Sequence, residues 1–395
     1  MARRSASSRF SGELLREWDK FFSLEPEWNA LLGRSRADTI FLRWEWIRAW
    51  AEVVHRDVQP AVVVARDGDG RLAAVAPLYV SALRFLRTVR YRTLLAMAQR
   101  EPGTAYPDLI VRADCEREGV AAIFAALGEA RDLWDCIWWP LMSGWTDAME
   151  RIVGGSAEQG FFCHVRPAEF AFLPLPPDYQ AYVSSLSLNT RKQIRKEQNR
   201  FDALGSVSIV QCSSQEDIPR FLEALFQLHE RRWASVGKVG AFRLEPKRAE
   251  FYRRFAPVAL ERGWLRLYGI QDHGELKAVQ IGYRYGDVYH ALQDGFDPAF
   301  AKGAGHLLRA HVIKRCIGEG IKAMDFLGDL TSHKKTWLAR ERLGHDVFVG
   351  RPAFKTRLLF ARRIWPTGRY LRPELPAAWQ CSNRTSERRS ASSVP

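Results

Sequence analysis

The chain has 395 residues, 47% hydrophobic residues and a formal net charge of +14 at pH 7. This length suits two domains of about 150–200 residues each, and the hydrophobic content excludes a largely disordered chain. The positive charge favours a polyanionic partner, namely nucleic acid, anionic lipid or a phosphorylated co-substrate.

The first half, residues 10–175, begins with helical periodicity and continues with strands. Leu42, Trp46 and Trp50 recur at helical spacing within residues 41–54. Residues 67–70, Asp-Gly-Asp-Gly, separate two strand-like runs and predict a hairpin. Further strands are expected at 91–97, 108–113, 134–142 and 161–175, with helices at 116–130 and 145–159. A cluster of prolines at 174–177 places a domain boundary after residue 175.

The second half, residues 176–352, repeats this order of elements. Helices are expected at 187–201, 215–235 and 246–262, strands at 206–212, 264–270, 277–285 and 288–296, and a strand on each side of residue 335, at 322–328 and 345–350. The repetition predicts an α+β fold made of two tandem domains, each a mixed, mainly antiparallel sheet flanked by helices.

The end of the chain is expected to differ from both halves. Residues 353–380 are predicted to form a basic helix, which either docks on the protein or contacts an anionic membrane surface. Residues 381–395 are rich in Ser and Arg, and we expect them to be disordered.

The cysteines and histidines give little sign of cross-links or metal ligands. Six cysteines lie far apart without a CxxC pair, and nine histidines show no ligand-like spacing. We therefore expect free thiols in a reducing compartment and no metal. The N-terminal stretch has no apolar run after its arginines, and no segment approaches about 18 uninterrupted apolar residues. These features predict a cytoplasmic protein without a secretory signal or a transmembrane segment.

A glycine-containing turn lies between the strand at 288–296 and an apolar-periodic segment that starts near residue 304. The turn reads Lys302-Gly303-Ala304-Gly305-His306. Glycines let an anion approach the backbone, and the start of a helix offers unpaired N–H groups and a positive dipole end. The turn is therefore either a phosphate cradle or an ordinary connection between strand and helix, and the residues alone do not distinguish these readings.

Two segments resemble known families. The meander followed by Gly303-Ala304-Gly305 is similar to the GNAT acyltransferase fold, although Phe300 stands where that family usually has Gln or Arg. The segment 320–344 resembles the C-terminal signature of the BioF2-like acyltransferases, a group associated with cellulose and exopolysaccharide loci and related to the Fem peptidyltransferases. The matching residues are Asp325-Phe326, Gly328-Asp329, His333-Lys334 and Trp337.

The resemblance implies transfer of an acyl group, with acetyl expected, from acyl-CoA to an amine in polysaccharide or cell-envelope metabolism. It implies acyl-CoA contacts at Lys302, Gly303, Ala304, Gly305 and His306. It implies acceptor or thioester contacts at Gln293, Asp294, Tyr106, Asp108 and Trp337. Asp329 or Asp325 would position or deprotonate the amine, and Lys334 would stabilise developing negative charge. His290 is expected to be a core or turn residue.

Two other functions stay open. One is a Fem-type transferase that takes an aminoacyl group from tRNA. The net positive charge of the chain suits binding of tRNA. The other is a non-catalytic scaffold that binds an anionic polymer or membrane. Arg191, Lys192, Arg195 and Lys196 occupy adjacent helical turns, and they form either a solvated face or an anion-binding stripe.

Overall fold

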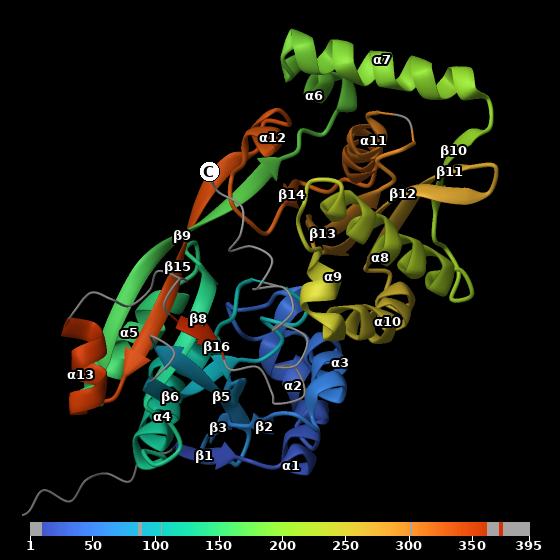
Figure 1. Cartoon of the computed structure of the whole chain (residues 1–395). Helices are drawn as coiled ribbons and strands as arrows, with labels where there is room; N and C mark the ends of the chain where they lie inside the picture. The colour runs from blue at the N-terminus through green and yellow to red at the C-terminus, as the bar shows by residue number, and fades with distance from the viewer. Residues whose placement is uncertain (1–9, 86–88, 104, 301, 362–370, 374–395) are drawn as a thin grey trace, which may run out of the picture.

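The computed structural model describes residues 10–85, 89–103, 105–300, 302–361 and 371–373, which form a mixed α+β structure (Figure 1). Most paired strands run antiparallel, which confirms the predicted fold class. The elements of the first half are β1 (Ser11–Leu15), α1 (Trp18–Phe22), α2 (Glu25–Leu32), η1 (Ile40–Leu42), α3 (Trp44–Val54), β2 (Gln59–Pro60), β3 (Val62–Arg66), β4 (Leu72–Ala76), β5 (Leu78–Phe85), β6 (Val89–Ala96), β7 (Ile110–Val111), η2 (Ala113–Cys115), α4 (Glu116–Glu129), β8 (Cys136–Ser143), α5 (Ala148–Glu158) and β9 (Phe162–Pro174).

The second half begins with two consecutive helices. Its elements are α6 (Tyr179–Ser185), α7 (Leu188–Leu204), β10 (Val207–Gln211), α8 (Ile218–Ala234), α9 (Ala241–Leu244), α10 (Pro246–Glu261), β11 (Leu265–Asp272), β12 (Glu275–Tyr285), β13 (Val288–Phe296), α11 (Ala304–Gly318), β14 (Ala323–Asp325), α12 (Ser332–Lys335), β15 (Arg340–Gly350), α13 (Phe354–Ala361) and β16 (Leu371–Pro373). The helix predicted over 353–380 is thus observed over Phe354–Ala361, and β16 is a strand within that range. The tail predicted at 381–395 lies outside the described residues.

The described strands form two sheets. A four-stranded sheet has the order β1-β3-β4-β7, and the predicted hairpin at 67–70 joins β3 to β4 within it. A twelve-stranded sheet runs β10-β11-β12-β13-β14-β9-β15-β8-β6-β5-β16, with β2 attached to β5. Each half contributes one parallel pair with a helix in its crossover, namely β6 and β8 around α4, and β13 and β14 around α11.

Strand β15 joins the two halves through the backbone. It pairs with β9 over eleven register positions and with β8 on its other side, although both partners belong to the first half. Strand β9 pairs in turn with β14 of the second half. The large sheet is therefore continuous across residue 175, where the sequence predicted a boundary between two domains.

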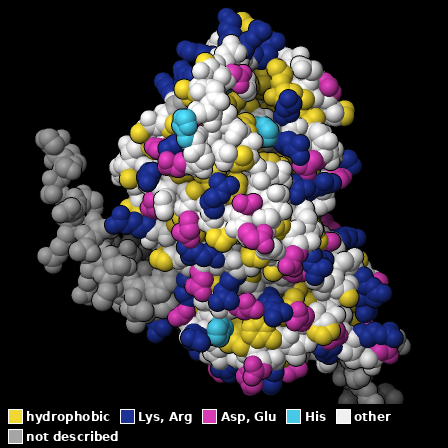
Figure 2. Space-filling model, turned by 90° about the vertical axis from the view of Figure 1, so that its right-hand side faces the viewer, with side chains coloured by type: hydrophobic (Ala, Val, Ile, Leu, Met, Phe, Trp, Pro, Cys, Tyr) yellow, Lys and Arg dark blue, Asp and Glu magenta, His cyan; other side chains and the backbone are white. Residues whose placement is uncertain are grey.

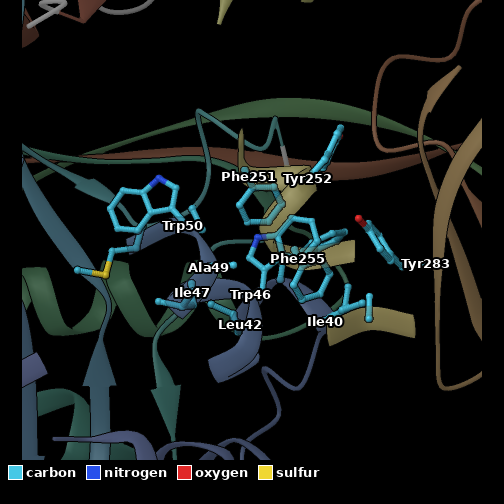
Figure 3. Close-up of a cluster of buried hydrophobic side chains, with 14 of the residues drawn as sticks. Ile40, Leu42, Trp46, Ile47, Ala49, Trp50, Phe251, Tyr252, Phe255 and Tyr283 are labelled. Carbon is cyan, nitrogen blue, oxygen red and sulfur yellow. The ribbon is translucent and has the colours of Figure 1, made fainter. Parts of the chain in front are cut away.

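An aromatic cluster packs α3 of the first half against α10 of the second (Figure 3). The Trp46 ring lies 4.7 Å from Phe251, 4.6 Å from Phe255 and 5.6 Å from Tyr283, measured between ring centroids. Trp46 is completely buried. Because aromatic side chains bury large apolar areas, this cluster stabilises the contact between the halves.

Five cysteines, at positions 115, 136, 163, 212 and 316, are free thiols, and Cys381 lies outside the described residues. Within the described ranges, no helix is both long and apolar enough to cross a membrane.

Candidate functional site

Strands β13 and β14 share only a short parallel contact. Residues Val288–His290 pair with Ala323–Asp325, whereas β13 continues to Phe296 with β12 on its other side. The separation begins at His290 and Asp325, and α11 starts shortly after β13 ends. We call this place, where β13 runs on beyond its pairing with β14, the opening. Backbone groups of β13 that no other part of the protein uses can bind a ligand there.

The predicted glycine turn forms the start of α11, as the sequence indicated. Gly303 is the N-cap residue with φ of 100°, a conformation that strongly favours glycine. Its carbonyl accepts hydrogen bonds from the N–H groups of His306 (3.0 Å) and Leu307 (2.9 Å). Because the first N–H groups of a helix have no partner within it, they can bind an anion at this position. The Lys302 side chain is exposed beside the turn.

The carboxylate of Glu197 on α7 lies directly against this turn. A Cβ added to Gly303 would overlap Glu197 Oε1, so the missing side chain leaves room for the carboxylate. His306 Nδ1 lies 2.6 Å from Glu197 Oε2, and Gln193 donates to Glu197 Oε1 at 3.0 Å. Glu197 is buried, although α7 is otherwise polar and basic. Glu197 was not predicted from the sequence, where its one signal was an acid that directly follows the basic stretch 191–196.

Helix α12 and the residues after it cover the first turn of α11. Trp337 is buried, and its ring centroid lies 4.4 Å from that of His306. The ring centroids of His333 and His306 are 6.5 Å apart. His333 is exposed at its surface, but partial desolvation, together with the nearby Arg309 and His306, lowers its pKa. This shift favours the neutral form of His333.

Lys334 lies in the same region and closes the loop that follows β14. Its Nζ donates to the carbonyl oxygens of Gly328 and Asp329, each at 2.9 Å. Burial and the nearby Arg309 lower the pKa of Lys334, while Asp329 and Asp325 act against this shift. Asp329 itself is exposed, whereas Asp325 is buried.

Asp294 on β13 is held by two arginines. Arg309 donates to Asp294 Oδ2 at 2.6 Å, and Arg232 pairs with Oδ1. Burial alone would raise the pKa of Asp294, but the two guanidinium groups hold it below its ordinary value. The neighbouring Gln293 side chain interacts with the Tyr252 hydroxyl. The Asp294 carboxylate is therefore held in place by the two arginines and stays ionised.

Asp325 connects the second half to the first. The Tyr106 hydroxyl donates to Asp325 Oδ2 at 2.7 Å, and the backbone N–H of Leu327 donates to Oδ1 at 2.9 Å. His290 Nδ1 lies 3.6 Å from Asp325 Oδ2. Burial and the Asp325 charge raise the pKa of Tyr106, so its hydroxyl keeps its proton.

Asp108 belongs to a different cluster, although it is close to Tyr106 in sequence. Arg151 donates to Asp108 Oδ2 at 2.6 Å and also pairs with Glu116. Burial raises the pKa of Asp108 to about 6 despite this ion pair. The structure thus gives Asp108 a structural partner rather than a contact with Asp325.

The fold brings most of the predicted site residues together around the opening. The glycine turn, Asp294, Asp325, Asp329, Lys334 and Trp337 are linked by hydrogen bonds, ring contacts and electrostatic interactions, and Tyr106 joins them from the first half. Three residues of this group, Glu197, Arg232 and Arg309, were not predicted from the sequence. Within the described ranges, no group of three or more His, Cys, Asp or Glu side chains could hold a metal ion.

The second half matches a known domain family. Residues 189–335 match the acetyltransferase (GNAT) domain, and this range includes the glycine turn, both strands of the opening and Lys334. The match supports an acyltransferase. No curated protein matches the chain in sequence.

Three solved structures are similar to this chain. FemX has a TM-score of 0.56 at 12% identity, with 85% of this chain and 98% of FemX covered. The C-terminal domain of a putative lysylphosphatidylglycerol synthetase from Agrobacterium fabrum has a TM-score of 0.48 at 11% identity, with 81% and 96% covered. A tandem GNAT protein from the clavulanic acid biosynthesis pathway has a TM-score of 0.45 at 12% identity, with 87% and 99% covered. At 12% identity, the similarity to FemX concerns the fold.

Proposed function

We propose that the protein is an acyl-CoA-dependent N-acyltransferase, with acetyl-CoA as its donor. The observation that carries this proposal is the opening between β13 and β14 beside a helix that begins with a glycine turn, inside the range that matches the GNAT domain. We propose that the acceptor is an amine on a saccharide or another cell-envelope metabolite, and that the reaction takes place in the cytoplasm.

The backbone of the glycine turn is suited to binding the pyrophosphate of acyl-CoA, but one acidic side chain lies beside it. Gly303 provides close access, and the helix start provides N–H groups and a positive dipole end. Lys302 adds an exposed positive charge. The Glu197 carboxylate faces the same turn, so a bound pyrophosphate would either displace it or lie beside it.

The residues around the opening can carry out the steps of acyl transfer. When bound, acyl-CoA would supply the thioester carbonyl, and its C–S bond would break to release the CoA thiolate as the bond to the amine forms. The exposed Asp329 carboxylate can accept the proton that the attacking amine loses. Lys334 donates two of its three Nζ protons to loop carbonyls. The third can stabilise the negative charge that develops on the thioester oxygen. Asp325 and Tyr106 fix the loop that carries Asp329 and Lys334.

Calorimetric titration with acetyl-CoA tests this proposal, with Lys302→Glu as the variant. The Lys302 side chain is exposed, so the change adds negative charge at the cradle without disturbing packing. A substitution at Gly305 is less suitable, because its Cβ would lie 2.9 Å from the Phe296 ring. We expect the wild type to bind one acetyl-CoA per chain and Lys302→Glu to bind it about fivefold more weakly or worse.

The matched control is Lys20→Glu, which makes the same charge change at an exposed lysine on α1. Its affinity for acetyl-CoA should stay within about twofold of the wild type. Equal weakening in both variants would show a general charge effect and contradict the assigned cradle. Absence of binding to the wild type would reject acyl-CoA as the donor.

A second candidate function is a transferase that uses aminoacyl-tRNA. Glu197 favours it, because a carboxylate at the cradle opposes a pyrophosphate but would not hinder a donor that binds elsewhere. Basic side chains of α7 are exposed at the top of the molecule (Figure 2), where a polyanion could bind. Binding of aminoacyl-tRNA at low salt, in a protein that does not bind acetyl-CoA, would support this candidate.

A further inference from the structure

Arg342 on β15 is a half-buried cation that packs against aromatic rings. Its Cζ lies 3.4 Å from the centroid of the Trp145 ring and 4.8 Å from that of Phe172. Stacking on an aromatic face orients a guanidinium and leaves its N–H groups free to bind in the plane. The planar group can then bind a carboxylate or a phosphate through two parallel hydrogen bonds.

Among the described residues, no carboxylate forms an ion pair with the Arg342 guanidinium and no acceptor forms a hydrogen bond with that group, although the Asp325 charge acts on it from nearby. The nearby Asp325 carboxylate is already used, since it accepts hydrogen bonds from Tyr106 and from the Leu327 N–H. A half-buried guanidinium without a partner has lost part of its hydration without gaining an ion pair in return. Such a group is suited to a ligand anion.

The neighbouring loop is built to hold the aromatic face in place. Gly144 packs so closely on the carbonyl of Leu343 in β15 that a Cβ would overlap it. This approach places Trp145 beside the strand, and the Trp145 ring contacts Tyr106 (5.0 Å) and Phe170 (5.8 Å). Trp145 still has 36% of its surface exposed, so one side of this arrangement faces solvent.

We infer that Arg342, stacked on Trp145, binds an anionic group of the acceptor, a carboxylate or a phosphate. The position supports this, because Trp145 contacts Tyr106, and the Tyr106 hydroxyl is bonded to Asp325 where β13 and β14 separate. An acceptor held at Arg342 by its anion could extend its amine toward the opening. The acceptor class is thus an amine that carries a carboxylate or a phosphate, and this assignment rests on the proposed acyltransferase function.

The first test needs neither the donor nor turnover. Phenylglyoxal reacts with accessible guanidinium groups, and peptide mass spectrometry measures its rate at each arginine. We expect inorganic phosphate or acetate to slow modification of Arg342 several-fold, relative to chloride at equal ionic strength. The stronger of the two anions identifies the ligand as phosphate or carboxylate. The control is Arg340, an exposed arginine on the same strand, whose rate should not change.

The second test separates recognition of the acceptor from binding of the donor. Arg342→Gln and the control Arg340→Gln are compared with the wild type on paired amines, glucosamine 6-phosphate with glucosamine, and glycylglycine with glycylglycinamide. We expect Arg342→Gln to raise KM about tenfold or more for the anionic member of the active pair, with KM for its neutral member and acetyl-CoA affinity unchanged. Arg342→Lys should recover part of the loss, because it keeps the charge but not the planar fork.

The proposal is overturned if neither anion protects Arg342, or if Arg342→Gln affects anionic and neutral acceptors equally. Failure to bind acetyl-CoA would reject the proposed donor. It would not affect the phenylglyoxal experiment, which tests anion binding at Arg342 without the donor.

Discussion

At the scale of single residues, Tyr106 occupies an unusual conformation that its surroundings stabilise. Its φ is 66°, which lies in the left-handed region. This conformation is energetically unfavourable for a residue with a large side chain. The ring packs against Phe170, Trp145 and Phe41, with centroids 4.8, 5.0 and 6.0 Å away. Its hydroxyl donates to Asp325, which is 219 residues away in the sequence. A single hydroxyl thus joins the first half of the chain to the opening.

We predict that Tyr106→Phe lowers the free energy of unfolding by about 2 kcal/mol at pH 7, because Asp325 is left buried without one of its donors. The ring and its packing are retained, so the loss isolates the hydroxyl. Urea denaturation followed by tryptophan fluorescence measures it.

The control for this prediction is Tyr285→Phe. Tyr285 donates to Asp38 at 2.6 Å, but that hydrogen bond is exposed to solvent. Its loss should cost less than about 1 kcal/mol. Similar losses of unfolding free energy in the two variants would show that the buried Tyr106–Asp325 hydrogen bond stabilises the protein no more than an exposed one.

At the scale of elements, α7 places opposite charges on its two faces. Arg191, Lys192, Arg195 and Lys196 are exposed, while Glu197 is buried against the start of α11. The helix ends at Gly205 in a left-handed conformation, and a second link to the turn is the hydrogen bond from Arg200 to the Lys302 carbonyl, at 2.6 Å. One helix therefore covers the glycine turn and also carries the basic surface.

We predict that Glu197→Gln strengthens acetyl-CoA binding about three- to tenfold. The amide can still accept a hydrogen bond, but it removes the negative charge that would face the pyrophosphate. Calorimetry measures the change directly, and the gain should shrink at high salt, because screening weakens the repulsion.

The comparison for Glu197→Gln is Glu129→Gln, an exposed glutamate at the end of α4, whose affinity for acetyl-CoA should not change. Weaker binding in Glu197→Gln would mean that the carboxylate orders the turn for the ligand rather than opposing it.

At the scale of the whole molecule, the contact between the halves includes two buried acids besides the aromatic cluster. Glu101 accepts a hydrogen bond from Trp50 Nε1 at 2.6 Å. Glu245 begins α10 and lies 3.7 Å from Arg100, but its Oε1 atom is buried without a hydrogen-bond partner. Burial, assisted by the charge of Glu101, raises the pKa of Glu245 to about 7, and Arg100 offsets only part of this rise.

This shift makes the stability of the protein depend on pH. Between the ordinary pKa of a glutamate, 4.5, and about 7, the folded state keeps the proton of Glu245 and the unfolded state has lost it. The folded state binds more protons in this window, so raising the pH lowers the free energy of unfolding. We predict a loss on the order of 2 kcal/mol from this residue between pH 4.5 and pH 7.

Urea denaturation at a series of pH values checks this prediction, with Glu245→Gln as the comparison. The variant cannot titrate at this position, so the difference in unfolding free energy between the two proteins should change in the variant's favour as the pH rises toward 7. A difference that is constant over this range would contradict the raised pKa of Glu245.

The sequence by itself determined the local elements and the fold class. Apolar periodicity located α4, α11 and β13, and glycines located the β3–β4 hairpin and the start of α11. These features depend on residues that are close in the chain, since helix periodicity, turn conformation and strand alternation are local properties. The roles expected for Lys334, Asp329 and the glycine turn stay predictions, although the fold brings these residues together.

Only the tertiary structure decided which charges meet. It placed Glu197 against the glycine turn, where its partner His306 is 109 residues away in the sequence. It also paired Asp294 with Arg309 and Arg232. Asp108 pairs with Arg151. The tertiary structure also paired β15 with two strands of the first half, and it left the Arg342 guanidinium without an ion pair or a hydrogen bond among the described residues. Such pairings depend on how helices and strands pack together, and no spacing along the chain encodes them. The chemistry of the opening is therefore fixed by packing between distant segments, whereas its scaffold can be predicted from the sequence.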